Sequence, residues 1–158
     1  LLLNILVLYS EKYKNMKIAI GCDHAGYELK EKLKEHLEGL NHVILDCGTY
    51  SETSVDYPDF GHAVGKEINS NNIKLGVLIC GSGNGISMVA NKYKNVRAAL
   101  CWTPEIAELA IKHNNANILA LPARYITDQE GLQILNTFLS TEFEGGRHER
   151  RVNKISCV

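Results

Sequence analysis

The chain has few of the features that mark membrane, secreted or nucleic-acid-binding proteins. No apolar run is long enough to span a bilayer. The five cysteines form no Cys-x-x-Cys pair, and their odd number is not typical of a disulfide framework. The formal net charge of -1 disfavours binding to nucleic acid through overall charge. We therefore expect a cytoplasmic protein with no nucleic-acid or membrane partner.

The composition is typical of one globular domain. The chain has 158 residues, of which 45% are apolar and 22% are charged. Its apolar start lacks the basic region and the small-residue cleavage site of a signal peptide. The first methionine is Met16, where a strand-like run begins. We expect residues 1–15 to be an extension outside the domain and residues 16–158 to form a single domain.

Strand and helix patterns alternate from Met16 onward. The expected strands are 16–20, 42–45, 75–79, 96–100 and 118–121. The expected helices are 29–40, 57–69, 86–93, 104–113, one after the capping box 127–130, and one within 145–155. This alternation predicts a parallel sheet covered on both faces. Ligands of such sheets bind at the carboxyl ends of the strands.

The most informative segment follows the third expected strand and reads Cys80-Gly81-Ser82-Gly83-Asn84-Gly85. Glycines at alternate positions allow several backbone N–H groups to turn toward one point, although a tight turn without a ligand is an alternative. The segment is not a Walker A loop. No Asp or Glu occurs in 86–104 to bind the ribose of a dinucleotide. Because such a group of amides can lower the pKa of a neighbouring thiol, Cys80 is a candidate base or nucleophile.

Three other cysteines, Cys22, Cys47 and Cys101, also follow expected strands. Their spacing matches no zinc module, so we expect small buried hydrophobic side chains rather than metal ligands.

Several polar residues each have a structural and a functional interpretation. Asp23 can cap a helix, or the pair Asp23-His24 can point into the cleft. His113 can stabilise a helix C-terminus, or it can act as a general acid near neutral pH. Arg147 and Arg151 also have two interpretations, and they lie four residues apart on one expected helical face.

That face is either a solvated basic surface or a phosphate-binding surface. Arg124, after the fifth strand, could join these arginines. We expect His36, His42 and His62 to be surface or structural residues.

Taken in order, these segments resemble the type B ribose-5-phosphate isomerases, within the wider group of phosphosugar isomerases that includes galactose-6-phosphate isomerase. The resemblance rests on segments 21–26, 56–58, 80–85, 90–92, 113–114 and 146–148, together with Arg151. These segments span nearly the whole chain after Met16.

The resemblance implies a Rossmann-like three-layer α/β/α sandwich with a five-stranded parallel sheet. It implies interconversion of ribose 5-phosphate and ribulose 5-phosphate through an enediolate, as in the pentose phosphate pathway. It also implies that no metal or cofactor takes part. The family forms homodimers, which can pair into tetramers, with sites at the dimer interface.

The resemblance also implies roles for particular residues. Cys80 would be the base, His113 would help to open the sugar ring, and Ser82 and Asp23 would complete the catalytic set. One branch of the family has a glutamate where this chain has Ile86, so this chain resembles the cysteine branch. The implied substrate-binding residues are Asp23, His24, Gly81, Ser82, Gly83, Asn84, Gly85, Asn114, Arg124, Arg147 and Arg151.

Three alternatives stay open. The first is an isomerase of a six-carbon sugar phosphate, such as allose 6-phosphate or galactose 6-phosphate. The second is a nucleotide- or flavin-binding module on a similar sheet. The third is a regulatory protein with an inactive site.

Overall fold

The computed structural model describes residues 15–156. The expected N-terminal extension, residues 1–15, therefore lies outside the described residues except for Asn15. Within the described residues, no helix is both long and apolar enough to cross a membrane.

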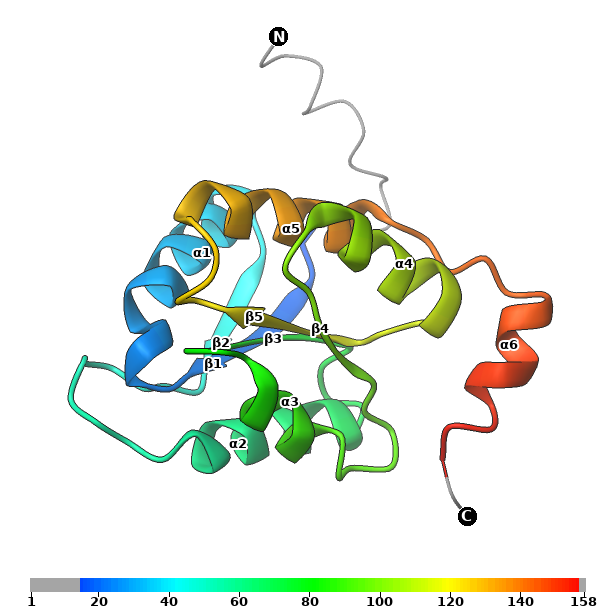
Figure 1. Ribbon diagram of the computed structural model, residues 1–158, viewed down its shortest axis with the longest axis horizontal. Coiled ribbons are helices and arrows are strands. Elements are labelled where there is room, and N and C mark those ends of the chain that lie inside the picture. The colour runs from blue at the N-terminus through cyan, green and yellow to red at the C-terminus, as the bar shows by residue number, and fades with distance from the viewer. Residues whose placement is uncertain (1–14, 157–158) are drawn as a thin grey trace, which may run out of the picture.

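A five-stranded parallel sheet forms the centre of the fold (Figure 1). Its order is β2-β1-β3-β5-β4, so the chain reverses direction across the sheet between β1 and β3. Continuous apolar strands favour this buried position because both faces of a parallel sheet are covered by helices. The strands are β1 (Lys17–Cys22), β2 (Val43–Asp46), β3 (Leu75–Cys80), β4 (Ala98–Leu100) and β5 (Ile118–Pro122).

Helices cover both faces, as the three-layer prediction requires (Figure 1). One layer contains α1 (Tyr27–Gly39), α4 (Pro104–Asn114) and α5 (Asp128–Ser140), and the other contains α2 (Tyr57–Asn69) and α3 (Asn84–Ala90). A short 3-10 turn, η3 (His24–Gly26), joins β1 to α1. The last helix, α6 (Arg147–Val152), lies beyond the end of α4 and outside both layers. The predicted fold class is confirmed.

Local signals explain several element boundaries. Thr103 caps α4 through its side chain, with Pro104 in the first turn, and Thr127 and Glu130 form the expected capping box of α5. Several predicted boundaries were wrong by one to three residues. Helix α3 begins at Asn84 rather than 86 and ends at Ala90, and β4 begins at Ala98 rather than 96.

Side chains explain the short β4. The Asn91 amide donates to the Ala98 carbonyl at 2.9 Å and accepts from the Ala98 N–H at 2.8 Å. Asn117 accepts from the N–H of Arg97 at 2.7 Å. Because the N–H of Arg97 bonds to a side chain, the strand ladder starts at Ala98, later than the apolar run suggests.

The apolar core lies on both faces of the sheet because strand side chains alternate. Ile18, Ile20 and Cys22 of β1 pack toward α1, α4 and α5, whereas Ala19 packs toward α2 and α3. Cys22 and Cys101 are fully buried, and Cys47 is half-buried. Burial raises the pKa of these three thiols, to about 12, 12 and 11 respectively.

Cys22 and Cys101 are buried packing residues, as expected, whereas Cys47 is only half-buried against the core. All four cysteines within the described residues are free thiols. The cytoplasmic location stays a prediction.

A buried lysine is the main departure from the amphipathic pattern of α1. The side chain of Lys30 is fully buried, and its Nζ lies 2.7 Å and 2.8 Å from the two carboxylate oxygens of Asp46, at the end of β2. The ammonium also lies over the rings of Tyr27 and Tyr50, 5.7 Å and 5.0 Å from their centroids. Asp46 in turn accepts from the N–H of Gly48 at 3.0 Å, so the pair fixes the start of the loop after β2.

We predict that Asp46→Asn destabilises the protein by about 3 kcal/mol, because it removes the closer of the two carboxylates that face the buried Lys30 ammonium and leaves only the half-exposed Glu31 at 3.1 Å. Burial raises the pKa of Asp46, but hydrogen bonds from Lys30, Gly48 and Lys34 outweigh burial and hold this pKa below its usual range. The stabilisation from Asp46 is therefore present at neutral pH and is lost as the pH falls through that lowered pKa.

Urea denaturation of Asp46→Asn at pH 7 measures the loss. Lys32→Gln is the matched control, because it breaks an ion pair to Asp128 in which both side chains are about half exposed. The control should unfold like the unmodified chain. Equal stability of Asp46→Asn and the control would show that the buried pair is not needed for folding.

Candidate functional site

The candidate site lies at the carboxyl ends of β1 and β3, where the strand order reverses. Crevices at this position bind ligands in open parallel sheets. The end of β5 completes the wall. A pocket of about 230 Å³ is lined by Asp23, His24, Ala25, Cys80, Gly81, Ser82, Arg124 and Tyr125.

Asp23 joins the two strands through its carboxylate. One oxygen, Oδ1, accepts from the N–H groups of Ala25 and Gly26 at 3.0 Å and 3.1 Å, which caps the turn η3. The other oxygen, Oδ2, accepts from the thiol of Cys80 at 2.9 Å. The capping and functional interpretations of Asp23 therefore both hold, because the two oxygens face different partners.

Cys80 ends β3, is 8% exposed and lines the pocket. Burial, followed by the hydrogen bond and the charge of Asp23, raises the pKa of this thiol to about 11. The N–H groups of Gly83 and Gly81 act in the opposite direction. The loop amides therefore lower the pKa of Cys80, as expected, but burial and the neighbouring carboxylate outweigh them within the single subunit.

Only one of the three loop glycines needs a left-handed backbone. Gly83 has φ 73°, and it precedes the first residue of α3. Gly85 has no such backbone, but a Cβ there would lie 2.6 Å from the ring of Tyr57. The regular spacing of the glycines therefore has two causes, a turn at Gly83 and close packing against Tyr57 at Gly85.

The remaining pocket residues supply polar groups at its rim. The N–H of Val55 donates to His24 Nδ1 at 3.3 Å, which leaves Nε2 of the neutral ring as the protonated nitrogen. Arg124 is exposed and lies against Gly81, where a Cβ would be 3.3 Å from its guanidinium. Ser82 is exposed and accepts from the N–H of Asn84 at 3.4 Å.

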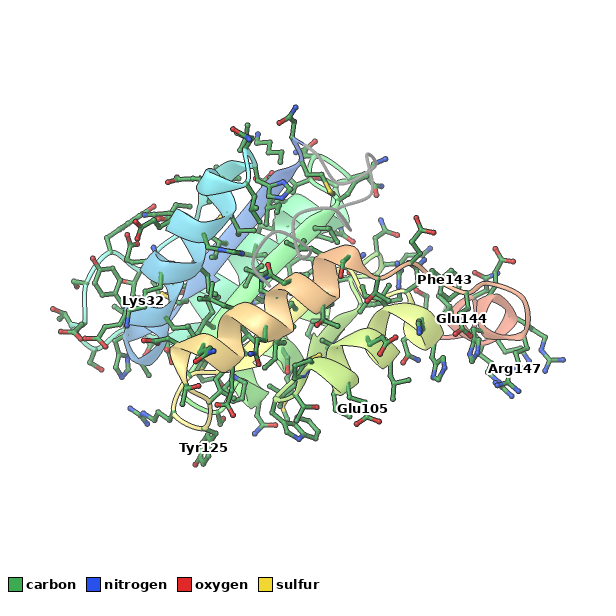
Figure 2. The ribbon with its side chains drawn as sticks, turned by 90° about the horizontal axis from the view of Figure 1, so that it is seen from above. Lys32, Glu105, Tyr125, Phe143, Glu144 and Arg147 are labelled. Atoms are coloured by element: carbon green, nitrogen blue, oxygen red, sulfur yellow. The ribbon has the colours of Figure 1, made fainter. Side chains whose placement is uncertain are left out.

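The other predicted site residues lie elsewhere in the subunit. Helix α4 starts at the carboxyl edge of the sheet and ends at the amino edge, and its 11 residues span about 16 Å. His113 and Asn114 therefore lie a helix length away from the Cys80 pocket. Arg147 and Arg151 lie on α6 beside that end of α4 and are exposed. Figure 2 shows the wide separation of Tyr125, in the pocket, from Arg147.

His113 and His148 form a second polar group. Their rings stack at a centroid distance of 4.3 Å and an interplanar angle of 7°. The Nε2 atom of His148 lies 3.3 Å from a carboxylate oxygen of Glu144.

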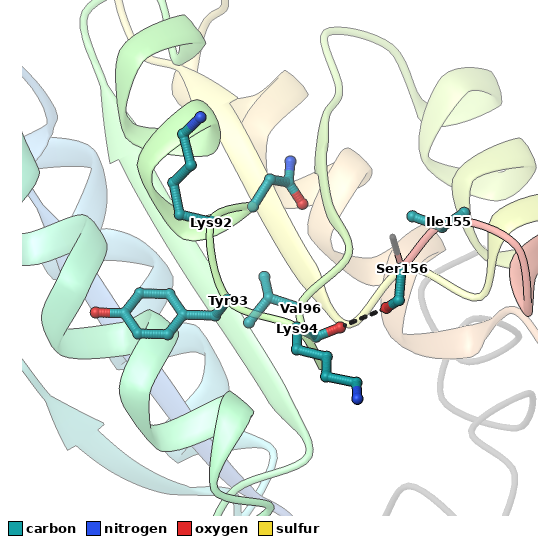
Figure 3. Close-up of a pocket in the computed structure, with 7 residues that line it drawn as sticks. Lys92, Tyr93, Lys94, Val96, Ile155 and Ser156 are labelled. Atoms are coloured by element: carbon teal, nitrogen blue, oxygen red, sulfur yellow. Dashed lines mark hydrogen bonds between the residues drawn. The ribbon is translucent and has the colours of Figure 1, made fainter. Parts of the chain in front are cut away.

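A larger hollow of about 400 Å³ lies at the end of α3 and the C-terminal segment (Figure 3). Lys92 and Lys94 line it, and Ser156 donates to the carbonyl of Lys94 at 3.0 Å. It contains no acid, thiol or imidazole that could move a proton. The Cys80 pocket is the candidate active site because it holds a thiol hydrogen-bonded to a carboxylate at the carboxyl ends of the strands.

A doubly wound sheet with a thiol–carboxylate pair at its switch point is consistent with an enzyme that moves protons on a small substrate. Comparison with known proteins identifies the class. The family model described as Ribose/Galactose Isomerase matches residues 18–155. The chain therefore belongs to this isomerase family, and the resemblance found in the sequence is confirmed.

Three relatives illustrate the similarity. Ribose-5-phosphate isomerase B of Escherichia coli strain K12 is 38% identical over 142 residues, covering 90% of this chain and 95% of the relative. A ribose 5-phosphate isomerase structure from Thermotoga maritima has 55% identity and a TM-score of 0.88, covering 90% and 99% of the two chains.

The third relative is ribose-5-phosphate isomerase B from Mycoplasma genitalium, whose structure has ribulose-5-phosphate bound. It has 44% identity and a TM-score of 0.85, covering 89% and 93% of the two chains. This chain is thus an isomerase, which disfavours the nucleotide-binding and regulatory alternatives.

Sequence reasoning missed two contributors to the site and its surroundings. Tyr125 lines the pocket although it is 76% exposed, and its position after Arg124 at the end of β5 was the available signal. Glu144 was missed because its proximity to His113 and His148 depends on how the chain turns through Gly145 and Gly146. The structural role expected for His36, His42 and His62 is consistent with their partners, which are Asn136, the Met16 N–H and the Tyr93 hydroxyl.

We predict that Asp23→Asn lowers the pKa of Cys80 below about 11, because the substitution removes the negative charge beside the sulfur and keeps the side-chain shape. Thiolate absorbance, followed through a pH titration and corrected with Cys80→Ser in the same background, measures this pKa. An unchanged or higher value would show that the carboxylate does not control the thiol.

Proposed function

We propose that the chain interconverts ribose 5-phosphate and ribulose 5-phosphate. We also propose that residues 16–158 form the single catalytic domain. The observation that carries the proposal is the buried hydrogen bond between Cys80 and Asp23, which lies under the amides of Gly81 and Gly83. Family membership and the neighbour with bound ribulose-5-phosphate support the same substrate.

The reaction moves a proton from C2 to C1 of the open-chain aldose phosphate. In the proposal the Cys80 thiolate takes the C2 proton, the C2–H electron pair forms a C1–C2 double bond, and the carbonyl pair moves to the C1 oxygen to give an enediolate. The proton of the C2 hydroxyl then moves to the C1 oxygen, and as the C2 carbonyl forms, the thiol returns its proton to C1. The N–H groups of Gly81 and Gly83 lie at the sulfur and can stabilise the negative charge that develops beside it. This scheme needs no metal or cofactor, and Ser82 and Asn84 at the same loop supply further polar contacts.

The thiol must lose its proton before it can act as a base. A pKa of about 11 leaves about one thiol in ten thousand ionised at pH 7. Asp23 accepts the thiol proton at 2.9 Å and is the nearest group that can take it. Positive charge placed over the pocket would shift the balance further toward the thiolate.

A second subunit would supply that positive charge. We propose a homodimer in which His113, Asn114, Arg147 and Arg151 of the partner subunit complete the Cys80 pocket. The separation of these residues from Cys80 within one chain supports the arrangement. Two arginines four residues apart on α6 suit bidentate binding of a phosphate, and Arg124 and His24 border the pocket from the other side.

In this arrangement the imidazole of His113 would move the proton that opens the sugar ring. Histidine is suited to the task because its pKa normally lies near neutrality. Exposed apolar side chains near the pocket, Tyr57, Trp102 and Tyr125, offer surface for the contact between subunits.

We predict that Cys80→Ala slows turnover of ribose 5-phosphate by about 100-fold or more, because it removes the sulfur that takes and returns the C2 proton in the proposal. A coupled assay of ribulose 5-phosphate formation measures the rate. Cys101→Ala is the control, since this buried thiol packs in the core away from the pocket. Near-normal turnover by Cys80→Ala would exclude the proposed base.

Mixed dimers test the shared site. Cys80→Ala and His113→Asn subunits should each be inactive alone, and an equimolar mixture refolded together should recover about one quarter of the unmodified activity. Half of the dimers in such a mixture are hybrids, and each hybrid has one intact site. No recovery in mixtures shown by mass spectrometry to contain hybrids would place both residues in the same subunit's site.

A six-carbon sugar phosphate is the second candidate substrate. The family description names both ribose and galactose, which favours keeping this alternative. Comparison of kcat/KM for ribose 5-phosphate, allose 6-phosphate and galactose 6-phosphate decides between them. A higher value for either six-carbon substrate would replace ribose 5-phosphate in the proposal.

A further inference from the structure

Three metal-ligating side chains meet at the far end of α4. His113 lies in the last turn of α4, His148 lies on α6, and Glu144 lies in the segment between α5 and α6. One ligand atom from each lies within 4.8 Å of the others. We propose that these three side chains bind a divalent transition-metal ion of the zinc class, and that the bound ion inhibits the isomerase by occupying His113.

The geometry needs only small side-chain movements to close around an ion. The His148 Nε2 atom already lies 3.3 Å from a carboxylate oxygen of Glu144. A metal ion between these two atoms would take the place of a proton. His148 is 6% exposed and is held by packing, whereas Glu144 is exposed and free to adjust. The His113 ring stacks on His148 and must tilt so that both lone pairs point to one centre.

The ligand types match this class of ion. Two imidazoles and one carboxylate are a common zinc set, and they leave a coordination position open for water or substrate. A neutral imidazole has the free lone pair that a metal requires.

Positively charged side chains near the three ligands weaken the affinity for a metal ion. Arg147 Nε lies 3.5 Å from Nε2 of His148 and competes for the same nitrogen. Its side chain is exposed, so it can turn toward solvent when an ion binds. The neighbouring Lys112 is held by an ion pair with Glu108 on its own helix.

The inhibition rests on the proposed role of His113 in opening the sugar ring, whereas metal binding does not. A metal bound to the His113 imidazole blocks the lone pair that would accept the ring proton. The enzyme should therefore be active after chelation and lose activity as zinc is added. Addition of EDTA should restore it.

The test uses the full chain after dialysis against EDTA. Isothermal titration with Zn²⁺ should show one ion per chain, and Glu144→Gln should weaken binding by about tenfold or more because it removes one ligand. Glu149→Gln, an equal charge change at an exposed position on α6, should bind like the unmodified chain. Both variants should keep the basal isomerase activity, because neither glutamate belongs to the proposed active site.

Cobalt substitution separates this site from the thiol pocket. Co²⁺ held by two imidazoles and a carboxylate gives no sulfur-to-cobalt charge-transfer band, whereas binding at Cys80 would give one. Binding that persists in Glu144→Gln but disappears in Cys80→Ser would overturn the proposal. So would the absence of zinc binding to the unmodified chain.

The activity measurements distinguish the two proposals. Tight zinc binding that depends on Glu144, with no effect on turnover, would support the metal site and overturn its inhibitory role. A chain that binds zinc through Glu144 but converts no sugar phosphate would support the metal site and contradict the proposed function instead.

Discussion

The carboxylate of Asp23 is the contact on which the candidate site depends. Its two oxygens join the turn after β1 to the thiol at the end of β3. The two strands are neighbours in the sheet, although Asp23 and Cys80 are 57 residues apart in sequence. One side chain therefore closes a local turn and, together with burial, favours the protonated thiol of Cys80. Because the carboxylate cannot move without disrupting the turn, the thiol has a fixed hydrogen-bond partner.

The ionisation of Cys80 links the site to assembly. Within one subunit, burial and Asp23 favour the protonated thiol, and the loop amides only partly oppose them. Within one subunit, the basic residues of α6 and the imidazole of His113 lie at the far end of α4, away from the Cys80 pocket. In the proposed dimer the same contact that completes the phosphate site also brings positive charge to the thiol, so substrate binding and base activation would depend on one interface.

Much of the fold could be predicted from local patterns. The alternation of apolar strands with amphipathic helices predicts a covered parallel sheet, and the caps at Thr103 and Thr127 fix two helix starts. The start of β4 was predicted too early because the side chain of Asn117 takes the N–H of Arg97. The burial of Lys30 could not be predicted, because its counter-charge Asp46 comes from a different element.

The sequence by itself determined the α/β class, the family and the residues that could do chemistry, because periodicity, caps and motif order are local properties of the chain. Only the tertiary structure decided which of those residues meet. It placed Asp23 against Cys80, raised the pKa of that thiol and grouped His113 with Glu144 and His148. Distances and burial between remote segments depend on how the sheet and helices pack, and no local pattern encodes them.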